Sequence, residues 1–213
     1  MLTLVLTRHG FTDRSDPVQF LGQCLDVPLS ARGRADAGAL GRRLAGVTFD
    51  RVISSPLLRA RETATLAAPG RTIETDARLA ESDFGEWEGF TIPEVDRRWP
   101  GTRAAWADDP ARNGPPGGEN AGDVARRVRS FLADLAASPA PDTDPTVLVV
   151  GHSTLNRILL AVALDLPVRD YRRRFRQDWV NLTVLRLEPD GRGLVVVAND
   201  TSHLDHPRAT PWT

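Results

Sequence analysis

The stretch LTLVLTRHG, residues 2–10, decides the fold of this 213-residue chain. Its first six residues are apolar or β-branched, and none of them is charged. A short run of this kind predicts a strand that is buried on both faces, and such strands are typical of parallel sheets with helices on each side. The tripeptide Arg8-His9-Gly10 then stands where the strand ends.

A second stretch of the same kind, VLVVGHS at residues 147–153, places Gly151, His152 and Ser153 after another apolar run. Helical and strand patterns alternate along the rest of the chain, which predicts an α/β protein. We expect a three-layer α/β/α sandwich around a mainly parallel, mixed sheet. The expected strands are 2–7, 51–54, 72–74, 147–150, 180–187 and 194–199, and the expected helices are 31–46, 57–67, 119–137 and 155–164.

One region interrupts this alternation. Residues 84–118 are rich in Trp, Pro and Gly and show only short helical patterns. We interpret them as a small lid inserted into a single domain that spans residues 1–213.

The composition excludes several classes of function. The 27 basic and 28 acidic residues leave a net charge of −1, which argues against a general affinity for nucleic acid or acidic membranes. All basic residues are Arg, so Schiff-base, pyridoxal-phosphate and Lys-bearing phosphate-loop chemistry are excluded. Cys24 is the only cysteine, which excludes an intrachain disulfide, and no set of His and carboxylate residues has the spacing of a metal site.

The N-terminal stretch also bears on location. Its apolar run ends at Arg8 and is too short for a signal peptide. No run approaches the 18 apolar residues of a membrane span. We therefore expect a soluble, cytoplasmic protein without a membrane partner.

The two predicted central strands end in similar residues. Because ligands of open α/β sheets bind beyond the carboxyl ends of the strands, we expect His9 and His152 to converge there. A neutral imidazole is a competent nucleophile, and the planar guanidinium of Arg8 suits phosphate oxygens. A second histidine, when protonated, stabilises charge on a transferring group. These residue types point to phosphoryl transfer without a metal.

Arg8-His9-Gly10 with Thr12 resembles the signature of the histidine phosphatase superfamily, which includes cofactor-dependent phosphoglycerate mutases and many phosphatases. Further segments resemble that family in the same order along the chain. They are Asp26–Ser30 with Gly33, Ser54–Ala60 with Glu62–Ala64, Leu79 and Glu81 with Phe84–Gly89, Gly117–Glu119, and Gly151-His152.

The resemblance implies a role for each matching residue. His9 is the nucleophile that becomes phosphohistidine, and Glu81 protonates the leaving oxygen. Arg8 and Arg59 grip the phosphoryl oxygens, and His152 completes the pocket. No cofactor and no metal is implied, the expected ligand is a small phosphorylated metabolite, and a homodimer is compatible with the sequence.

The chain departs from the family pattern along one loop. Phe11 stands where members often carry Glu, and Ser15 stands where many carry an Asn that touches phosphate. We expect Ser15, together with Ser153 beside the second histidine, to contribute to phosphate binding. The segment 22–26 is one residue longer than the family form.

Three functions compete. The first is a phosphomonoester hydrolase, the second is a phosphoglycerate-type mutase, and the third is a non-catalytic phosphate-binding module. The complete set of candidate catalytic residues argues against the third. Mutases of the family carry a long insertion with Lys and Arg, whereas residues 90–120 are few and contain no Lys. The sequence therefore favours the hydrolase. The basic run Arg172–Arg176 is expected to be a solvated face or a contact to a second anionic group.

Overall fold

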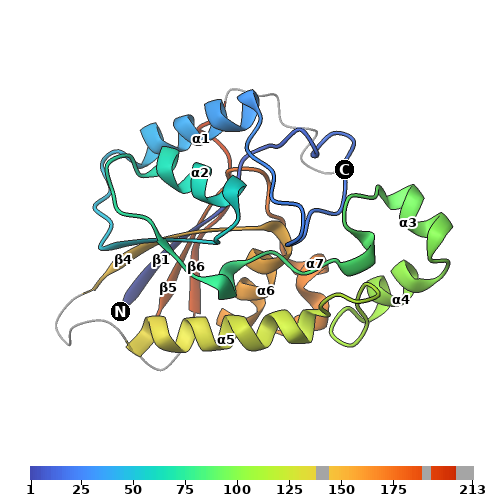
Figure 1. Ribbon diagram of the computed structural model, residues 1–213. Coiled ribbons are helices and arrows are strands. Elements are labelled where there is room, and N and C mark those ends of the chain that lie inside the picture. The colour runs from blue at the N-terminus through green and yellow to red at the C-terminus, as the bar shows by residue number, and fades with distance from the viewer. Residues whose placement is uncertain (138–143, 189–192, 205–213) are drawn as a thin grey trace.

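The computed structural model describes residues 1–137, 144–188 and 193–204. The described residues form a six-stranded sheet in the order β3-β2-β4-β1-β5-β6 (Figure 1). Strand β5 pairs antiparallel with both β1 and β6, whereas the pairs β1–β4, β2–β4 and β2–β3 are parallel. The expected mainly parallel, mixed sheet is thus confirmed. The strands are β1 (Leu2–Arg8), β2 (Arg51–Ser54), β3 (Glu74–Thr75), β4 (Thr146–Gly151), β5 (Leu182–Leu187) and β6 (Gly193–Asp200).

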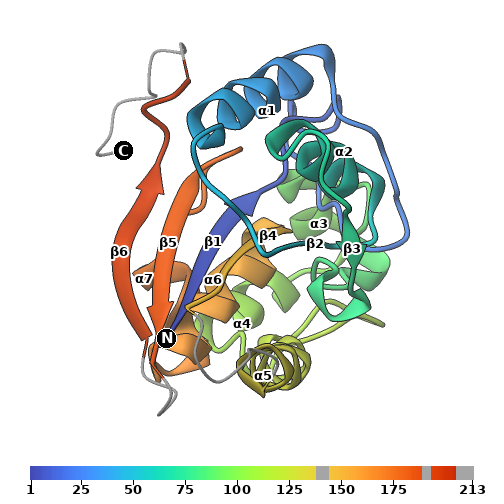
Figure 2. The ribbon, with the colours of Figure 1, turned by 90° about the vertical axis from the view of Figure 1, so that its left-hand side faces the viewer.

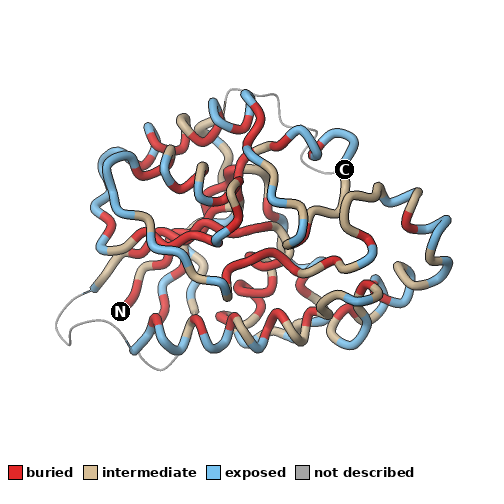
Figure 3. The backbone as a smooth tube through the Cα atoms, viewed as in Figure 1, coloured by how far each residue is buried: buried red, intermediate tan, exposed pale blue. Residues whose placement is uncertain are grey.

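Helices cover both faces of the sheet, as Figure 2 shows. Helices α1 (Ala31–Leu44) and α2 (Leu58–Ala67) lie on one face, and α5 (Ala121–Ala137) and α6 (Ser153–Ala163) lie on the other. Successive side chains of a strand point to opposite faces, so a central strand must be apolar throughout. Leu4 and Leu6 of β1 pack with α5 and α6, while Val5 packs with α1 and α2. The central strands are accordingly buried along their length (Figure 3).

The helix boundaries follow local capping chemistry. Helix α1 begins after Ser30, as expected, because the Ser30 hydroxyl accepts the backbone N–H of Gly33 at 3.1 Å. Helix α5 begins at Ala121 instead of residue 119 because Asn120 and Asp123 bond each other's backbone N–H groups, both at 3.0 Å. This cap leaves Glu119 outside the helix and free to bond elsewhere.

Two other elements differ from the sequence-based expectation. Strand β3 has only two residues, Glu74–Thr75, at the edge of the sheet, and begins two positions later than expected. The basic run begins with a short helix, α7 (Tyr171–Arg174), which the sequence pattern did not predict. Tyr171 is buried there and three arginines are exposed, which is the distribution of a short amphipathic turn.

The 84–118 segment contains helices α3 (Ile92–Arg98) and α4 (Thr102–Asp108) and lies at the end of the sheet opposite the N-terminus (Figure 1). An aromatic cluster holds it. Its members are Phe84, Trp87, Val95 and Trp106, with Phe20, Phe90 and Trp99 packed against them. The cluster is separate from the two clusters beneath the sheet-covering helices. That the segment acts as a lid stays a prediction.

Candidate active site

The register of the two central strands brings the two sequence stretches together. Arg8 of β1 lies opposite Gly151 of β4, and the backbone N–H of His9 donates to the Gly151 carbonyl at 3.0 Å. The rings of His9 and His152 consequently lie 5.0 Å apart between centroids. The expected convergence of the histidines is confirmed. Both are almost fully enclosed, with exposed fractions of 4% and 0%.

Gly10 holds the turn after β1 close to the start of α1. A Cβ at Gly10 would lie 2.7 Å from the Gly33 carbonyl oxygen, and one at Gly33 would lie 2.0 Å from the Phe11 carbonyl oxygen. Both distances are too short for a carbon atom, so both positions require glycine. This close approach fixes where the chain leaves His9.

The ring of His9 is oriented by its own neighbour. Its Nδ1 lies 2.8 Å from the carbonyl oxygen of Gly10. Because a carbonyl oxygen only accepts, Nδ1 carries the hydrogen, and the neutral ring keeps its lone pair on Nε2. This is the tautomer that a nucleophile needs.

Burial and neighbouring charge act on both imidazoles in the same direction. Burial, followed by the charges of Arg59 and Arg8, lowers the pKa of His9 well below its usual value. Burial, followed by the charge of Arg59, does the same to the pKa of His152. Both rings are therefore neutral at pH 7, which differs from the protonated second histidine considered from the sequence.

His152 keeps one ring nitrogen available. Its Nε2 lies 2.8 Å from the Ser55 hydroxyl, and that hydroxyl oxygen accepts the backbone N–H of Leu57 at 3.3 Å. Ser55 can therefore donate its own hydrogen to Nε2, which leaves the hydrogen of His152 on Nδ1. This buried Nδ1 has no hydrogen-bond partner among the described residues. A neutral His152 thus still offers a donor.

Arg8 is held by the loop that precedes β5. One terminal nitrogen donates to the Gln177 carbonyl at 2.9 Å, and the guanidinium carbon lies 3.2 Å from the centroid of the Trp179 ring. The same indole lies 5.1 Å from the ring of His9. Burial lowers the pKa of Arg8 to about 9, so the group remains a cation at neutral pH.

Arg59 is the second cation of the site and is fully buried. It stands in the first turn of α2, and its guanidinium donates to the carbonyls of Gly22 at 2.8 Å and Leu25 at 3.3 Å. Burial lowers the pKa of Arg59 from its usual value, and the charge of Glu81 opposes that change. Arg59 therefore joins the loop around residues 22–25 to the pocket.

Glu81 is held at the start of α6. Its Oε1 accepts the backbone N–H groups of Ser82 at 2.9 Å and Leu155 at 3.0 Å, and its Oε2 accepts that of Thr154 at 3.2 Å. Thr154 and Leu155 are among the first residues of α6, where N–H groups have no partner within the helix. The carboxylate therefore lies at the N-terminus of α6, where it contacts the residue two positions after His152.

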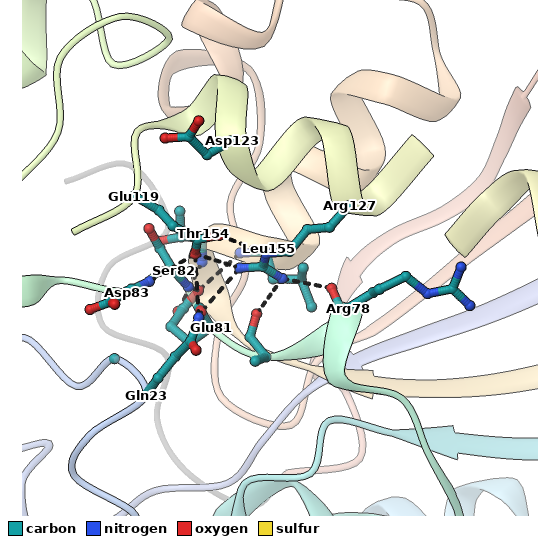
Figure 4. Close-up of polar contacts among 12 residues, drawn as sticks. Gln23, Arg78, Glu81, Ser82, Asp83, Glu119, Asp123, Arg127, Thr154 and Leu155 are labelled. Carbon is teal, nitrogen blue, oxygen red and sulfur yellow. Dashed lines mark hydrogen bonds and ion pairs between the residues drawn. The ribbon is translucent and has the colours of Figure 1, made fainter. Parts of the chain in front are cut away.

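The half-buried guanidinium of Arg127 positions the chain around Glu81 (Figure 4). Arg127 of α5 donates to both carboxylate oxygens of Glu119, at 3.0 and 2.9 Å, and to the backbone carbonyl of Glu81 at 3.1 Å. It also donates to the carbonyls of Arg78 and Ala80, at 2.6 and 2.7 Å. The sequence motifs included Glu119 but assigned it no role, and they did not include Arg127. Helix α5 contains several arginines, and the sequence does not indicate which of them points toward Glu81.

The two serines expected near the phosphate differ in position. Ser15 is buried, and its hydroxyl accepts the backbone N–H of Thr12 at 3.0 Å within one tight turn. Ser153 is partly buried and begins α6 directly after His152. Their contribution to phosphate binding stays a prediction. Ser55 and Trp179, which contact His152 and His9, received no role in the sequence analysis.

One group of described side chains has ligand atoms close enough to share a cation: Cys24, Asp83 and Glu88. The carboxylate of Glu88 already accepts the backbone N–H groups of Gln23 at 2.7 Å, Cys24 at 2.9 Å and Leu25 at 3.1 Å. Those bonds explain Glu88 as an anchor for the loop. The sequence-based prediction that no metal is needed remains to be tested.

The order of these residues and their arrangement agree with a known family. The sequence profile of the histidine phosphatase superfamily (branch 1) matches residues 4–200. This chain belongs to that superfamily. The family resemblance in the sequence motifs is therefore confirmed over nearly the whole chain.

Individual members of the superfamily are closely similar. The glucosyl-3-phosphoglycerate phosphatase of Mycobacterium tuberculosis is 38% identical over 175 residues, covering 79% of this chain and 78% of its own length. A solved structure of mycobacterial glucosyl-3-phosphoglycerate phosphatase with VO3 has a TM-score of 0.84 at 35% identity, covering 92% of this chain and 98% of that one. A probable phosphoglycerate mutase, GpmB of Salmonella choleraesuis, is 32% identical over 216 residues and covers 97% of both chains.

The sequence predicts no membrane-spanning segment, and the helices can be compared with that prediction. Within the described residues of this histidine phosphatase superfamily member, no helix combines the length and apolar character that a membrane span requires.

Proposed function

We propose that this chain is a metal-independent phosphomonoester hydrolase that acts on a small phosphorylated metabolite through a phosphohistidine on His9. One observation carries the proposal. The buried pair His9 and His152, with rings 5.0 Å apart, interacts with the charges of the buried Arg59 and the half-buried Arg8. A neutral nucleophile next to two guanidiniums suits a phosphoryl dianion.

In the first step, Nε2 of His9 attacks phosphorus, and the bond from phosphorus to the leaving oxygen breaks. Glu81, in its protonated form, gives its proton to that oxygen, so the leaving group departs as an alcohol. Arg8, Arg59 and the Nδ1–H of His152 hold the three remaining phosphoryl oxygens. Ser15 and Ser153 are proposed to add hydroxyl contacts to the same group.

In the second step, water attacks the phosphorus atom of phosphohistidine, and the bond between phosphorus and nitrogen breaks. Glu81, now a carboxylate, accepts the proton of that water. Inorganic phosphate leaves, and His9 returns to its neutral form. The charge that develops on the phosphoryl oxygens is offset by the two arginines, so the mechanism needs no metal ion.

The wider proposal concerns organisation. The chain is proposed to act as a single domain over residues 1–213, with the 84–118 segment as a lid over the leaving group. A cytoplasmic location and a homodimer are part of the same proposal, and neither nucleic acid nor a membrane is a proposed partner.

A mutase is the alternative function. The similarity of this chain to a probable phosphoglycerate mutase makes a direct test worthwhile. The enzyme is incubated with 3-phosphoglycerate, and the release of phosphate and the formation of 2-phosphoglycerate are measured with and without a bisphosphate primer. We expect free phosphate at each turnover and little isomerisation. Primer-dependent interconversion with little phosphate release would show a mutase.

The same preparation tests the intermediate and the metal. Labelled p-nitrophenyl phosphate should leave a labelled, acid-labile phosphoryl group on the protein, as phosphohistidine does. Turnover should be unchanged by a chelator. Loss of turnover with a chelator and its recovery with an added metal ion would contradict the metal-independent mechanism.

A further inference from the structure

Arg157 lies in α6, about one turn beyond the backbone N–H groups of Thr154 and Leu155 that donate to Glu81. It follows Thr154 by three residues, so the two side chains lie on the same side of the helix. The backbone N–H of Thr154 donates to Glu81 at 3.2 Å, and its side chain bonds that of Tyr171 in α7. Arg157 interacts electrostatically with Glu81 and Arg8 of the candidate active site and with Tyr171 of α7, so it lies near both.

The guanidinium of Arg157 lacks a counter-ion in the described part of the chain. Its Nε is enclosed without a hydrogen-bond partner, and none of the ion pairs found there involves it. Two carboxylates act on it from nearby, those of Glu81 and Asp178. Both have other partners, because Glu81 accepts backbone N–H groups and Asp178 binds Arg176 at 2.8 Å.

Burial lowers the pKa of Arg157 from its usual value, and the charges of Arg172 and Arg8 lie close enough to interact with it. A half-buried cation without a matched anion is costly, so proteins rarely retain one without a use. The missing partner is an anion.

Arg172 supplies a second cation from the facing element. Its guanidinium carbon lies 4.0 Å from the centroid of the Trp106 ring, and Trp106 belongs to the aromatic cluster of the 84–118 segment. Stacking covers one face of the guanidinium and leaves its edge N–H groups free to donate. Arg172 is exposed, and it has no ion pair within the described ranges.

We propose that Arg157 and Arg172 form a second anion site, which binds a carboxylate carried by the leaving group of the phosphomonoester substrate. Each of the two guanidiniums presents a planar edge of N–H donors, which fits the two oxygens of a carboxylate. Preference for a second phosphate is the competing outcome of the test below. The inference rests on the proposed hydrolase, because it assigns the leaving group of that reaction.

Two pairs of substrates that differ in one carboxylate test this site. They are 3-phosphoglycerate against glycerol 3-phosphate, and phosphoserine against phosphoethanolamine. For the unaltered enzyme, kcat/KM should be higher for the carboxylate of each pair by about tenfold to a hundredfold, the range of one charge-assisted hydrogen bond. p-Nitrophenyl phosphate serves as the substrate that does not reach the second site.

Variants connect this preference to the two arginines. Arg157→Gln should remove most of the preference, mainly by raising KM for the carboxylate substrates, and Arg172→Gln should remove a smaller part. Turnover of p-nitrophenyl phosphate should stay within about threefold in both. Arg173→Gln is the matched control, since Arg173 is exposed on the same short helix, and its substrate preference should be unchanged.

The outcomes separate this inference from the proposed function. Normal hydrolysis of p-nitrophenyl phosphate without any preference for the carboxylates would overturn the second site and leave the hydrolase standing. A stronger preference for propane-1,3-diol bisphosphate would overturn its assignment to a carboxylate. No hydrolysis of any phosphomonoester would overturn both.

If Arg157→Gln does not fold, inhibition of the unaltered enzyme decides. Glycerate should then inhibit p-nitrophenyl phosphate hydrolysis at concentrations about tenfold or more below those of glycerol, by the same charge-assisted bond. Equal inhibition by the two compounds would contradict the second site.

Discussion

The proposed phosphoryl end of the site and its proposed leaving-group end are held by different kinds of structure. His9 and His152 stand directly after two strands that are buried on both faces and joined by a continuous parallel register. The 84–118 segment instead carries short helices around an aromatic cluster of its own. Arg172 meets that cluster through a single stacking contact with Trp106.

The difference teaches where this fold tolerates change. A shift of β1 or β4 would disturb the whole core together with both histidines. A change in the 84–118 segment disturbs a cluster that is separate from the two main cores. The candidate catalytic residues are thus tied to the central sheet, whereas Trp106, the residue that Arg172 contacts, belongs to a separate cluster.

The largest expected effect comes from removing the nucleophile. His9→Ala should lower turnover of every phosphomonoester by a factor on the order of 10⁴ or more, because no other group can form the covalent intermediate. The measurement is kcat with p-nitrophenyl phosphate, with His203→Ala as the matched histidine control. Normal turnover in His9→Ala would remove the mechanism.

A smaller effect, which depends on the substrate, is expected at Glu81. Glu81→Gln keeps the shape of the side chain and removes the acid, so alkyl phosphates should lose about 10²- to 10³-fold in kcat. Aryl phosphates should lose far less, because their leaving oxygen needs little protonation. Glu86→Gln, an exchange at a carboxylate that bonds Trp99, is the control. Equal losses on both substrate classes would show that Glu81 is not the acid.

A change in the aromatic cluster of the 84–118 segment should lower stability without lowering turnover of a substrate that does not need this segment. Trp106→Ala removes a buried indole from the aromatic cluster and should lower the free energy of unfolding by about 3 kcal/mol. Turnover of p-nitrophenyl phosphate should change by no more than about threefold. Urea unfolding and steady-state kinetics measure the two quantities. A collapse of p-nitrophenyl phosphate turnover in a folded variant would show that the two ends are not independent.

The smallest expected effect is a dependence of the free energy of unfolding on pH, caused by His9 and His152. The folded-state pKa values of His9 and His152 lie below the ordinary value of 6.5, so the unfolded chain binds more protons than the folded protein as pH falls below 6.5. The free energy of unfolding should therefore be unaffected by these groups above pH 6.5. Below it, the free energy should fall by up to about 1.4 kcal/mol per pH unit for each ring.

Urea unfolding at pH 7.5, 6.5 and 5.5 measures that dependence. The variant His152→Gln should show a shallower fall between pH 6.5 and 5.5 than the unaltered protein. A stability that rises as pH falls through this range would contradict the neutral, buried histidines.

Much of the fold could be predicted from the sequence because the central strands are marked by short, continuous apolar runs. The apolar runs before His9 and His152 predicted two buried strands, and their convergence followed from the parallel sheet. Ser30 predicted the start of α1 through its own side chain. Signals of this kind are local, so one sequence is enough to read them.

The supporting contacts were not accessible in this way. Trp179 and Arg127 act on His9 and on the Glu81 segment from distant parts of the chain, and their neighbours in the sequence give no sign of it. Helix α7 has only four residues, too few for a periodic pattern. Such features depend on how separate elements meet, which only the folded arrangement shows.

The indole of Trp179 has a consequence for observing the reaction. It lies 3.2 Å from the guanidinium carbon of Arg8 and 5.1 Å from the ring of His9, measured from its centroid. The fluorescence of an indole responds to charge beside its ring. In the proposed mechanism, a phosphoryl group on His9 adds negative charge next to the positive charge of Arg8, so the emission of Trp179 should change with the covalent state of His9. Stopped-flow fluorescence should then follow the rise and decay of the proposed phosphoenzyme in real time, with no label attached.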